Sequence, residues 1–308
     1  MVATKKLLVV ALLGLQGLGA GVLHSQVPPN PPFKEEMSRQ DAIYRDRDGK
    51  INEGYVINRA LVAYADALTQ EFDRALASLG PEGRWLDVGA GEGHAILDYY
   101  TPAYDQSHEA GRLQRGSKAS AVALSIEDRR TDRWHRTAAA LGGRKIQYFH
   151  GRSFREYSAK ELGRFQLISD MLGGFSYTAY LDQYMERALE ILETGGNLYT
   201  LLQDVHAANG GNKPYYAGSP YLTELTDADG AELKVCSWLK SISCVQVSCE
   251  LKPDWKPPIE VYHVRKVCDA VKVPSLETLH FVAGMPPERR FDQAVAHILV
   301  VVEKKDRP

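Results

Sequence analysis

The sequence predicts an α/β fold in which a mostly parallel sheet is covered by helices on both faces. Strand-like and helical segments alternate between residues 84 and 202, which is typical of parallel strands joined by crossover helices. A glycine-rich turn joins the first strand candidate to the first helix candidate, as in many ligand-binding sheets. At 308 residues, with 44% hydrophobic and 25% charged residues, the chain is long enough for one large domain.

The alternating segments can be assigned in order along the chain. A helical pattern over residues 55–79 ends at Gly80-Pro81, because proline interrupts a helix. The strand candidates are residues 84–88, 121–126, 145–149, 165–170 and 197–202, and the helix candidates begin at Gly93 and cover residues 130–141 and 180–192. Because parallel strands end at the same edge of a sheet, we expect ligands to bind beyond those carboxyl ends.

The N-terminal segment has the pattern of a secretory signal peptide. Two lysines precede an apolar run, and a polar stretch begins near residue 25. We therefore expect a signal peptide over residues 1–25, a proline-rich linker and lead-in over residues 26–54, and export of the mature chain to the periplasm or the medium. The run is short and glycine-rich, so no stable membrane span is expected after cleavage. The alternatives are an uncleaved N-terminal anchor and a cytoplasmic chain whose translation begins at Met37.

The four cysteines lie close together in the last third of the chain. An even number in one segment of an exported protein is typical of two disulfides, whereas in a cytosolic chain buried thiols are the alternative. The spacing leaves all three pairings open and contains no Cys-x-x-Cys pair, so no metal site is expected. The cysteines are Cys236, Cys244, Cys249 and Cys268.

The alternation of strand and helix candidates stops after residue 202. Residues 203–275 are rich in Gly, Pro, Tyr and Cys, and we expect them to form an insertion or substrate lid on a domain that covers residues 55–308. Two late strand candidates, residues 277–283 and 294–302, follow this segment. We expect them to form a hairpin that closes the sheet.

The glycine turn reads LDVGAGEG over residues 86–93 and favours one class of nucleotide over another. A dinucleotide-binding turn requires a third glycine at the position that His94 occupies. Asp87 and Glu92 would repel a pyrophosphate but are compatible with a ligand that carries an ammonium and a sulfonium group. The turn therefore favours S-adenosylmethionine over a nicotinamide dinucleotide.

The same turn resembles motif I of the class I S-adenosylmethionine-dependent methyltransferases. The resemblance continues in the acidic pair Glu127-Asp128 after the second strand candidate and in the Gly195-Gly196 turn before the fifth. It implies a Rossmann-like fold with a mostly parallel seven-stranded sheet, helices on both faces, and S-adenosyl-L-methionine as the cofactor. Glu127, with Asp128 as the alternative, would bind the ribose hydroxyls. The turn residues implied in cofactor binding are Asp87, Gly89, Ala90, Gly91 and Gly93.

Two departures from the family pattern bear on the ligand and the substrate. The family often places Asp and a small residue after the third strand to contact adenine, but this chain has Gly151-Arg152-Ser153-Phe154. Ser153 and Phe154 are therefore the candidates for the adenine contact. The fourth strand is not followed by the Pro-Pro-Tyr signature of enzymes that methylate base amines. With a formal net charge of −2, the chain is not expected to bind nucleic acid.

Asp170, at the end of the fourth strand candidate, is the candidate catalytic base and a second candidate cofactor contact. An Asp at a strand end also commonly caps the following turn, and this alternative stays open. The resulting hypothesis is an S-adenosylmethionine-dependent methyltransferase that acts on an unidentified acceptor, a small molecule or protein rather than a nucleic-acid base. The alternatives are an exported, non-catalytic binding protein on the same fold and an aminopropyl transferase.

Overall fold

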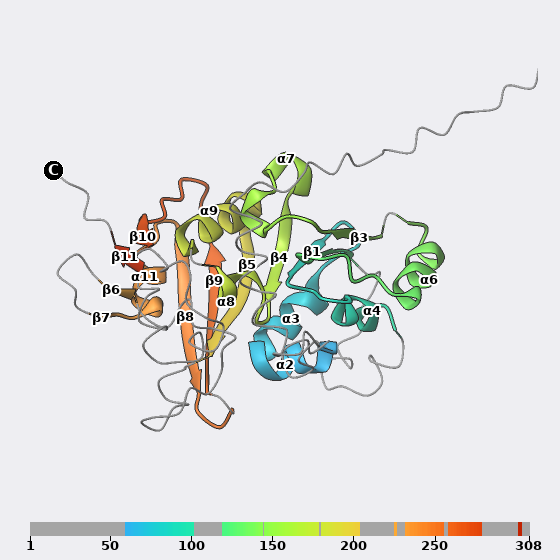
Figure 1. The fold of residues 1–308 in the computed structure, drawn as a ribbon, viewed down its shortest axis with the longest axis horizontal. Coiled ribbons are helices and arrows are strands. Elements are labelled where there is room, and N and C mark those ends of the chain that lie inside the picture. Colours follow the sequence, from blue (N-terminus) through green and yellow to red (C-terminus); the bar gives the residue numbers. More distant parts are fainter. Residues whose placement is uncertain are drawn as a thin grey trace, which may run out of the picture.

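A seven-stranded sheet forms the centre of the molecule (Figure 1), in the strand order β3-β2-β1-β4-β5-β9-β8. The computed structural model describes residues 59–101, 119–143, 145–178, 180–203, 225–226, 232–255, 258–278 and 301–303. Strands β3, β2, β1, β4 and β5 pair in parallel, and β9 pairs antiparallel with both β5 and β8. The predicted mostly parallel, seven-stranded sheet is therefore confirmed, and β9 is its one reversed strand.

The strands form where apolar residues run between turns. Strands β1 and β4 have the predicted bounds, whereas β5 begins five residues earlier than expected. The strands of this sheet are β1 Arg84–Val88, β2 Ser120–Leu124, β3 Ile146–Phe149, β4 Phe165–Asp170, β5 Leu192–Gln203, β8 Val245–Lys252 and β9 Ile259–Lys266.

The predicted helices occur in the predicted order, but the first of them is divided into two. The helical pattern that was predicted over residues 55–79 is interrupted at Thr69, whose φ is +84°. A left-handed backbone angle breaks the helical path, so two short helices form. The helices are α2 Leu61–Leu68, α3 Gln70–Ser78, α4 His94–Tyr99, α6 Asp132–Ala140, the 3₁₀ turn η2 Phe154–Glu156, α7 Ala159–Leu162, α8 Gly174–Tyr177, α9 Leu181–Ile191 and α11 Val235–Ser241.

Each face of the sheet has its own apolar core. Residues of α2, α3 and α4 pack with Trp85 and Leu167 on one face, whereas residues of α9 and α11 pack with Leu86 and Ile168 on the other. Neighbouring residues of one strand thus enter different cores, because side chains alternate across a strand. The predicted helices on both faces are confirmed (Figure 1).

The prediction for residues 203–275 was partly wrong. Strands β8 and β9 lie inside that range and complete the main sheet, so this part is not a lid. The two late strands do pair antiparallel, as predicted, but they belong to a separate four-stranded sheet of order β10-β11-β6-β7 and do not close the main sheet. Its strands are β10 Leu276–Thr278, β11 Val301–Glu303, β6 Leu225–Thr226 and β7 Glu232–Leu233.

Two disulfides hold the end of the main sheet where β8 and β9 lie. Cys236 of α11 is bonded to Cys249 of β8, and Cys244, just before β8, is bonded to Cys268, just after β9. The Cα atoms are 6.2 and 5.1 Å apart, within the range of natural disulfides. All four cysteines are paired, and the structure selects one of the three pairings that the sequence left open.

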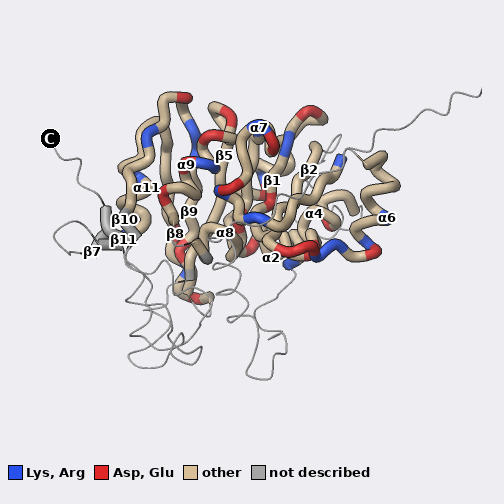
Figure 2. The backbone as a smooth tube through the Cα atoms, turned by 45° about the horizontal axis from the view of Figure 1, so that its top comes forward, with Lys and Arg blue, Asp and Glu red and all other residues tan. Residues whose placement is uncertain are grey.

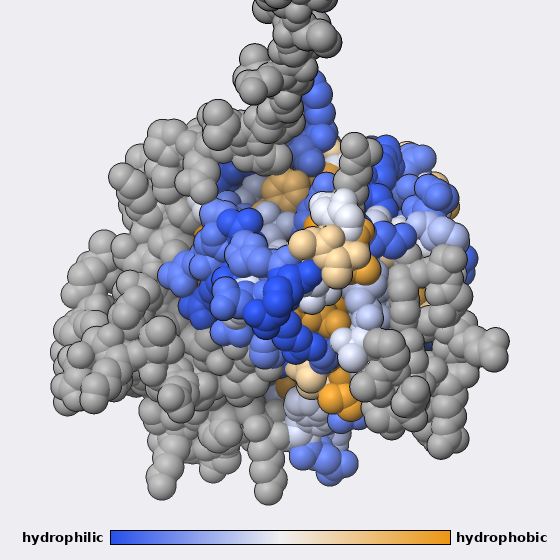
Figure 3. All heavy atoms as spheres, turned by 90° about the vertical axis from the view of Figure 1, so that its right-hand side faces the viewer, coloured by the Kyte–Doolittle hydropathy of each residue, from blue (hydrophilic) through white to orange (hydrophobic). Residues whose placement is uncertain are grey.

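The predicted signal peptide, the proline-rich linker and Met37 lie outside the described residues. Within the described part, none of the helices combines the length and the apolar character that crossing a bilayer requires. Lys and Arg are interspersed with Asp and Glu along the described chain (Figure 2). At the end of the molecule that carries α6, hydrophilic residues predominate, with smaller apolar areas between them (Figure 3).

Candidate functional site

The glycine turn lies directly beyond the carboxyl end of β1. Gly89, Gly91 and Gly93 have φ values of +76°, +55° and +75°, a region that side chains disfavour. The backbone N–H groups of Gly89 and Ala90 both donate to the Leu124 carbonyl at the end of β2, over 2.8 and 3.0 Å. The turn is therefore held against the neighbouring strand at the edge where ligands were expected.

Two of these glycines are also required by packing. A Cβ on Gly89 would lie 2.4 Å from the Cα of Gly173, and a Cβ on Gly93 would lie 2.4 Å from Cζ3 of Trp134. Both distances are too short for any real Cβ contact. The glycine turn thus packs between the loop after β4 and helix α6, and its spacing has a steric reason as well as the predicted functional one.

Asp87 points from β1 into the core on the α2 side rather than into the turn. Its carboxylate accepts a hydrogen bond of 3.0 Å from the Tyr64 hydroxyl and one of 2.8 Å from the Ser169 hydroxyl. Ser169 in turn accepts from Nε1 of Trp85 over 2.8 Å. Burial raises the pKa of Asp87 to about 7. Asp87 therefore supports the turn from within the core.

The acidic pair after β2 lies at the rim of the same edge. The Glu127 carboxylate is 2.9 Å from the Arg129 guanidinium, and its side chain is 40% exposed. Asp128 is paired with Arg130, whose hydrogen bonds lower the pKa of Asp128 to about 2. Both carboxylates are reachable from solvent, but a ribose hydroxyl would have to compete with an arginine for either of them.

Tyr148 of β3 joins the rim to the glycine turn, a role that no pattern in the sequence indicated. Its hydroxyl donates to the Gly91 carbonyl over 2.6 Å and lies 3.3 Å from the Glu127 carbonyl. It accepts a hydrogen bond of 3.3 Å from the Arg129 backbone N–H. The structure thus brings together Gly91 and Glu127, which sequence reasoning had assigned to one site.

Ser153 and Phe154, the candidates for the adenine contact, are engaged inside the protein. The Ser153 hydroxyl and backbone N–H both donate to the Glu156 carboxylate over 3.0 Å, which caps η2. The Phe154 ring is buried and packs on Tyr184, with 4.9 Å between the ring centroids. The half-buried His150 lies nearer the rim instead, with Nε2 3.6 Å from the Asp128 carboxylate, and Ile126, two residues before Asp128 in the chain, is also half-buried.

Asp170 is buried on the opposite face of the sheet from Asp87. Its carboxylate accepts hydrogen bonds from the Gly173 and Phe175 backbone N–H groups, over 2.7 and 2.8 Å, and from the Tyr184 hydroxyl over 2.7 Å. Burial raises its pKa to about 6. This geometry matches the turn-capping alternative. By fixing Gly173, Asp170 also places the loop after β4 against Gly89.

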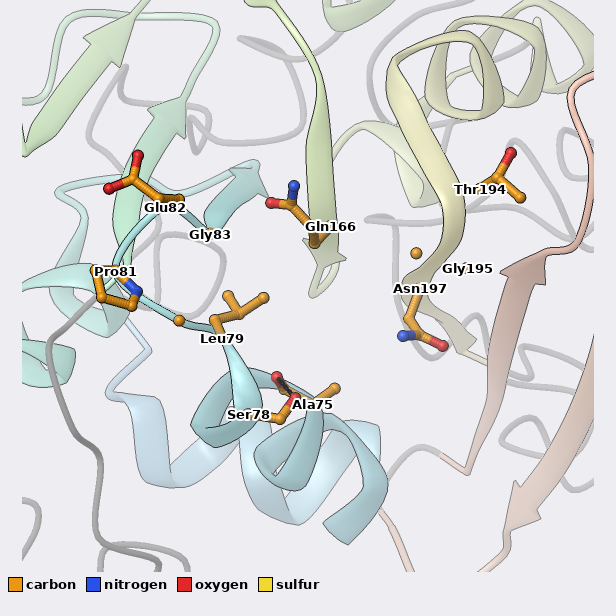
Figure 4. Close-up of a pocket in the computed structure, with 12 residues that line it drawn as sticks. Ala75, Ser78, Leu79, Pro81, Glu82, Gly83, Gln166, Thr194, Gly195 and Asn197 are labelled. Carbon is orange, nitrogen blue, oxygen red and sulfur yellow. Dashed lines mark hydrogen bonds between the residues drawn. The ribbon is translucent and has the colours of Figure 1, made fainter.

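A separate hollow of about 550 Å³ opens at the other edge of the sheet (Figure 4). It lies between the end of α3 and the amino ends of β1 and β4, and the turn within β5 also lines it. Gln166 accepts from the Arg84 backbone N–H over 2.7 Å, and Oδ1 of Asn197 lies 2.8 Å from Nε2 of His263. None of the predicted site residues lines this hollow.

The strand order decides the fold. In the class I methyltransferases, one antiparallel strand lies between the fifth strand and the last strand of an otherwise parallel sheet. Here β9 is that strand, between β5 and β8. This chain has the class I methyltransferase fold. The glycine turn and the acidic rim occupy the carboxyl edge of this fold, where its ligands bind.

Several solved structures are distantly similar to this chain. An rRNA methylase from Streptococcus thermophilus is 13% identical over 64% of this chain and 94% of its own, with a TM-score of 0.39. A possible exported protein from Bordetella parapertussis is 18% identical over 64% and 66%, with a TM-score of 0.41. A precorrin-6y C5,15-methyltransferase from Geobacter metallireducens is 12% identical over 73% and 98%, with a TM-score of 0.37. The strand order, rather than these similarities, defines the fold.

No protein-family model matches the chain, and no curated protein matches it either.

Proposed function

We propose that this methyltransferase-fold chain binds S-adenosyl-L-methionine at the carboxyl edge of the sheet and transfers its methyl group to a small molecule or a protein. One observation carries the proposal: the hydroxyl of Tyr148 holds the acidic glycine turn, at Gly91, next to the exposed carboxylate segment at Glu127. The methionine end would lie against the turn and the ribose against Glu127.

The charges of the site suit a cationic ligand. Glu92 lies on the turn beside His94, and Glu127 and Asp128 lie on the rim, each paired with an arginine. An ammonium or a sulfonium group of the ligand would compete with these partners for the carboxylates. In the bound state, Glu127 would exchange Arg129 for the ribose hydroxyls. Ile126 and His150 replace Ser153 and Phe154 as the proposed adenine contacts, because both are half-buried, His150 lies beside Asp128, and Ile126 directly precedes the Glu127 segment.

The bound cofactor would supply an already activated methyl carbon, so alignment with the acceptor provides most of the catalytic advantage. A general base is required only if the acceptor must lose a proton. Asp170 is engaged by three donors, and we propose that it holds the loop after β4 rather than removing that proton.

Titration calorimetry with S-adenosylhomocysteine tests the proposed cofactor site. The Glu127→Ala variant should bind at least about tenfold more weakly, the loss of about 1.4 kcal/mol expected for one charge-assisted hydrogen bond. Glu190→Ala is the matched control, because Glu190 also pairs with an arginine but lies on α9. Equal affinity of wild type and Glu127→Ala would overturn the ribose assignment, and no binding to wild type would overturn the proposed function.

Two observations favour a second candidate, an exported binding protein without catalytic activity. The N-terminal pattern predicts export, and two disulfides are typical of an oxidising compartment. Mass spectrometry of the native N-terminus distinguishes the cases: Gln26 indicates export, Met37 a cytoplasmic chain, and Met1 an uncleaved anchor. An assay with methyl-labelled S-adenosylmethionine against small molecules and proteins then separates a transferase from a protein that only binds. The mass of any product distinguishes methyl from aminopropyl transfer.

A further inference from the structure

The side chain of Tyr148 contacts both segments of the proposed cofactor site. Its hydroxyl donates to the Gly91 carbonyl over 2.6 Å and accepts from the Arg129 backbone N–H over 3.3 Å. These two partners come from the turn after β1 and the segment after β2, while Tyr148 itself lies on β3. One hydroxyl therefore joins the glycine turn to the segment after β2, in addition to the backbone hydrogen bonds from Gly89 and Ala90 to Leu124.

The ring of Tyr148 is held in place from two sides. It packs edge-on against Trp134, with 5.2 Å between the centroids, and the Arg130 guanidinium lies 5.7 Å from its centroid. Trp134 also touches Gly93, so the ring belongs to the same packed unit as the glycine turn. Burial raises the pKa of Tyr148 above its usual value, so the hydroxyl keeps the proton that it donates to Gly91 at neutral pH.

We infer that Tyr148 is a positioning residue of the cofactor site, one that sets the spacing between the glycine turn and the Glu127 segment. This inference rests on the proposed function. A ligand that spans both segments, such as S-adenosylhomocysteine, depends on that spacing at both of its ends. A ligand that reaches only the Glu127 side, such as adenosine, does not depend on it.

The test compares the two ligands in the variant Tyr148→Phe, which retains the ring and removes the hydroxyl. By titration calorimetry, S-adenosylhomocysteine should bind about tenfold more weakly to Tyr148→Phe, because the two segments that it spans would no longer be held at the wild-type spacing. A tenfold change corresponds to about 1.4 kcal/mol of binding free energy. Adenosine should bind within about twofold of its wild-type affinity. This difference between the two ligands is a readout that a general loss of stability would not produce, since unfolding weakens both ligands alike.

The matched control is Tyr100→Phe. The Tyr100 hydroxyl also donates to backbone carbonyls, at Ala119 over 2.5 Å and at Lys145 over 3.4 Å, but these lie at the amino ends of β2 and β3. Tyr100→Phe should lower the melting temperature about as much as Tyr148→Phe and leave both affinities unchanged.

The calorimetric results distinguish the positioning role of Tyr148 from the proposed cofactor site. If wild type binds S-adenosylhomocysteine and Tyr148→Phe binds it equally well, or if both ligands weaken together, the positioning role of Tyr148 is wrong while the cofactor site stands. If wild type does not bind S-adenosylhomocysteine, the proposed function itself fails. Selective weakening of S-adenosylhomocysteine in Tyr148→Phe supports the inference.

Discussion

The Tyr64 hydroxyl donates a 3.0 Å hydrogen bond to the Asp87 carboxylate and so links helix α2 to the carboxyl end of strand β1. Both groups are fully or nearly fully buried. Burial raises the pKa of the Asp87 carboxyl, and the hydrogen bonds from the Ser169 and Tyr64 hydroxyl groups offset only part of that rise. This pair gives the first prediction.

The unfolding free energy should fall as the pH rises through the range in which Asp87 loses its proton. The usual pKa of 3.8 rises to about 7 in the folded chain, so between these values the folded state binds more protons than the unfolded state, and stability decreases with pH. In Asp87→Asn the slope of the unfolding free energy against pH should be less steep by up to ~1.4 kcal/mol per pH unit, the contribution of one proton. Urea unfolding between pH 4 and 8 measures the difference.

The control for this measurement is Asp66→Asn, which removes an exposed carboxylate from the same helix that supplies Tyr64. Its pH dependence should match that of wild type. Identical slopes for Asp87→Asn and wild type would contradict the assignment of a proton to the buried Asp87.

Replacing Gly89 with alanine should destabilise the chain and abolish binding of S-adenosylhomocysteine. The new Cβ would lie 2.4 Å from the Cα of Gly173, in a residue whose φ is already +76°. Gly142→Ala is the control, since Gly142 has a φ of +78° but open space around it. The backbone angle alone should cost about 1 kcal/mol, and the clash at Gly89 should add about 1–3 kcal/mol. If urea unfolding gave equal losses of unfolding free energy for Gly89→Ala and Gly142→Ala, the glycine turn and the loop at Gly173 would not be tightly packed, contrary to this prediction.

Removing either disulfide should lower the unfolding free energy by about 3 kcal/mol under oxidising conditions, because the bond restricts the unfolded chain. The double variants Cys236→Ser with Cys249→Ser and Cys244→Ser with Cys268→Ser each remove one bond. Thiol labelling of the unreduced, unfolded wild type should detect no free cysteine. Labelled thiols in freshly purified wild type would contradict the pairing and weaken the case for export.

Asp170 and Tyr184 should behave as one unit in a double-mutant cycle. Asp170→Asn and Tyr184→Phe each remove the same 2.7 Å hydrogen bond, so the double variant should lose about 0.5–3 kcal/mol less than the sum of the single losses. Pairing Asp170→Asn with Tyr157→Phe provides the control, because the Tyr157 hydroxyl bonds to the His150 carbonyl instead. If the losses of unfolding free energy for Asp170→Asn and Tyr184→Phe were additive, the hydrogen bond between the two side chains would not be the main role of Asp170.

The local pattern of the sequence predicted the centre of the fold well and its edge poorly. Strands β1 and β4 are buried apolar runs between turns, so their bounds were predicted without error. Strand β8 lies at the edge of the sheet and alternates half-buried with exposed residues. That alternation was present in the sequence, but β8 lies within a longer segment rich in Gly, Pro, Tyr and Cys, which was predicted as an insertion.

The glycine turn and the acidic rim were found from the sequence because their residues are neighbours in the chain. The hydroxyl groups that organise them were not, since Tyr148 is 57 residues from Gly91 and Tyr64 is 23 residues from Asp87. No local pattern specifies which tyrosine meets which carbonyl or carboxylate. The orientation of Asp87 and Asp170 into opposite cores likewise depends on the packing of the helices on both faces.

The fully buried carboxylates of Asp87 and Asp170 limit how far the chain can be shortened. Asp87 is paired with α2, which precedes the sheet, and Asp170 is paired with α9 on the other face. A fragment that began at β1 would contain the whole glycine motif but would lack the Tyr64 hydroxyl, one of the two hydroxyl groups that donate to Asp87. The motif is therefore not a portable module, and fusion or minimal-domain designs based on this chain must retain its α2 helix.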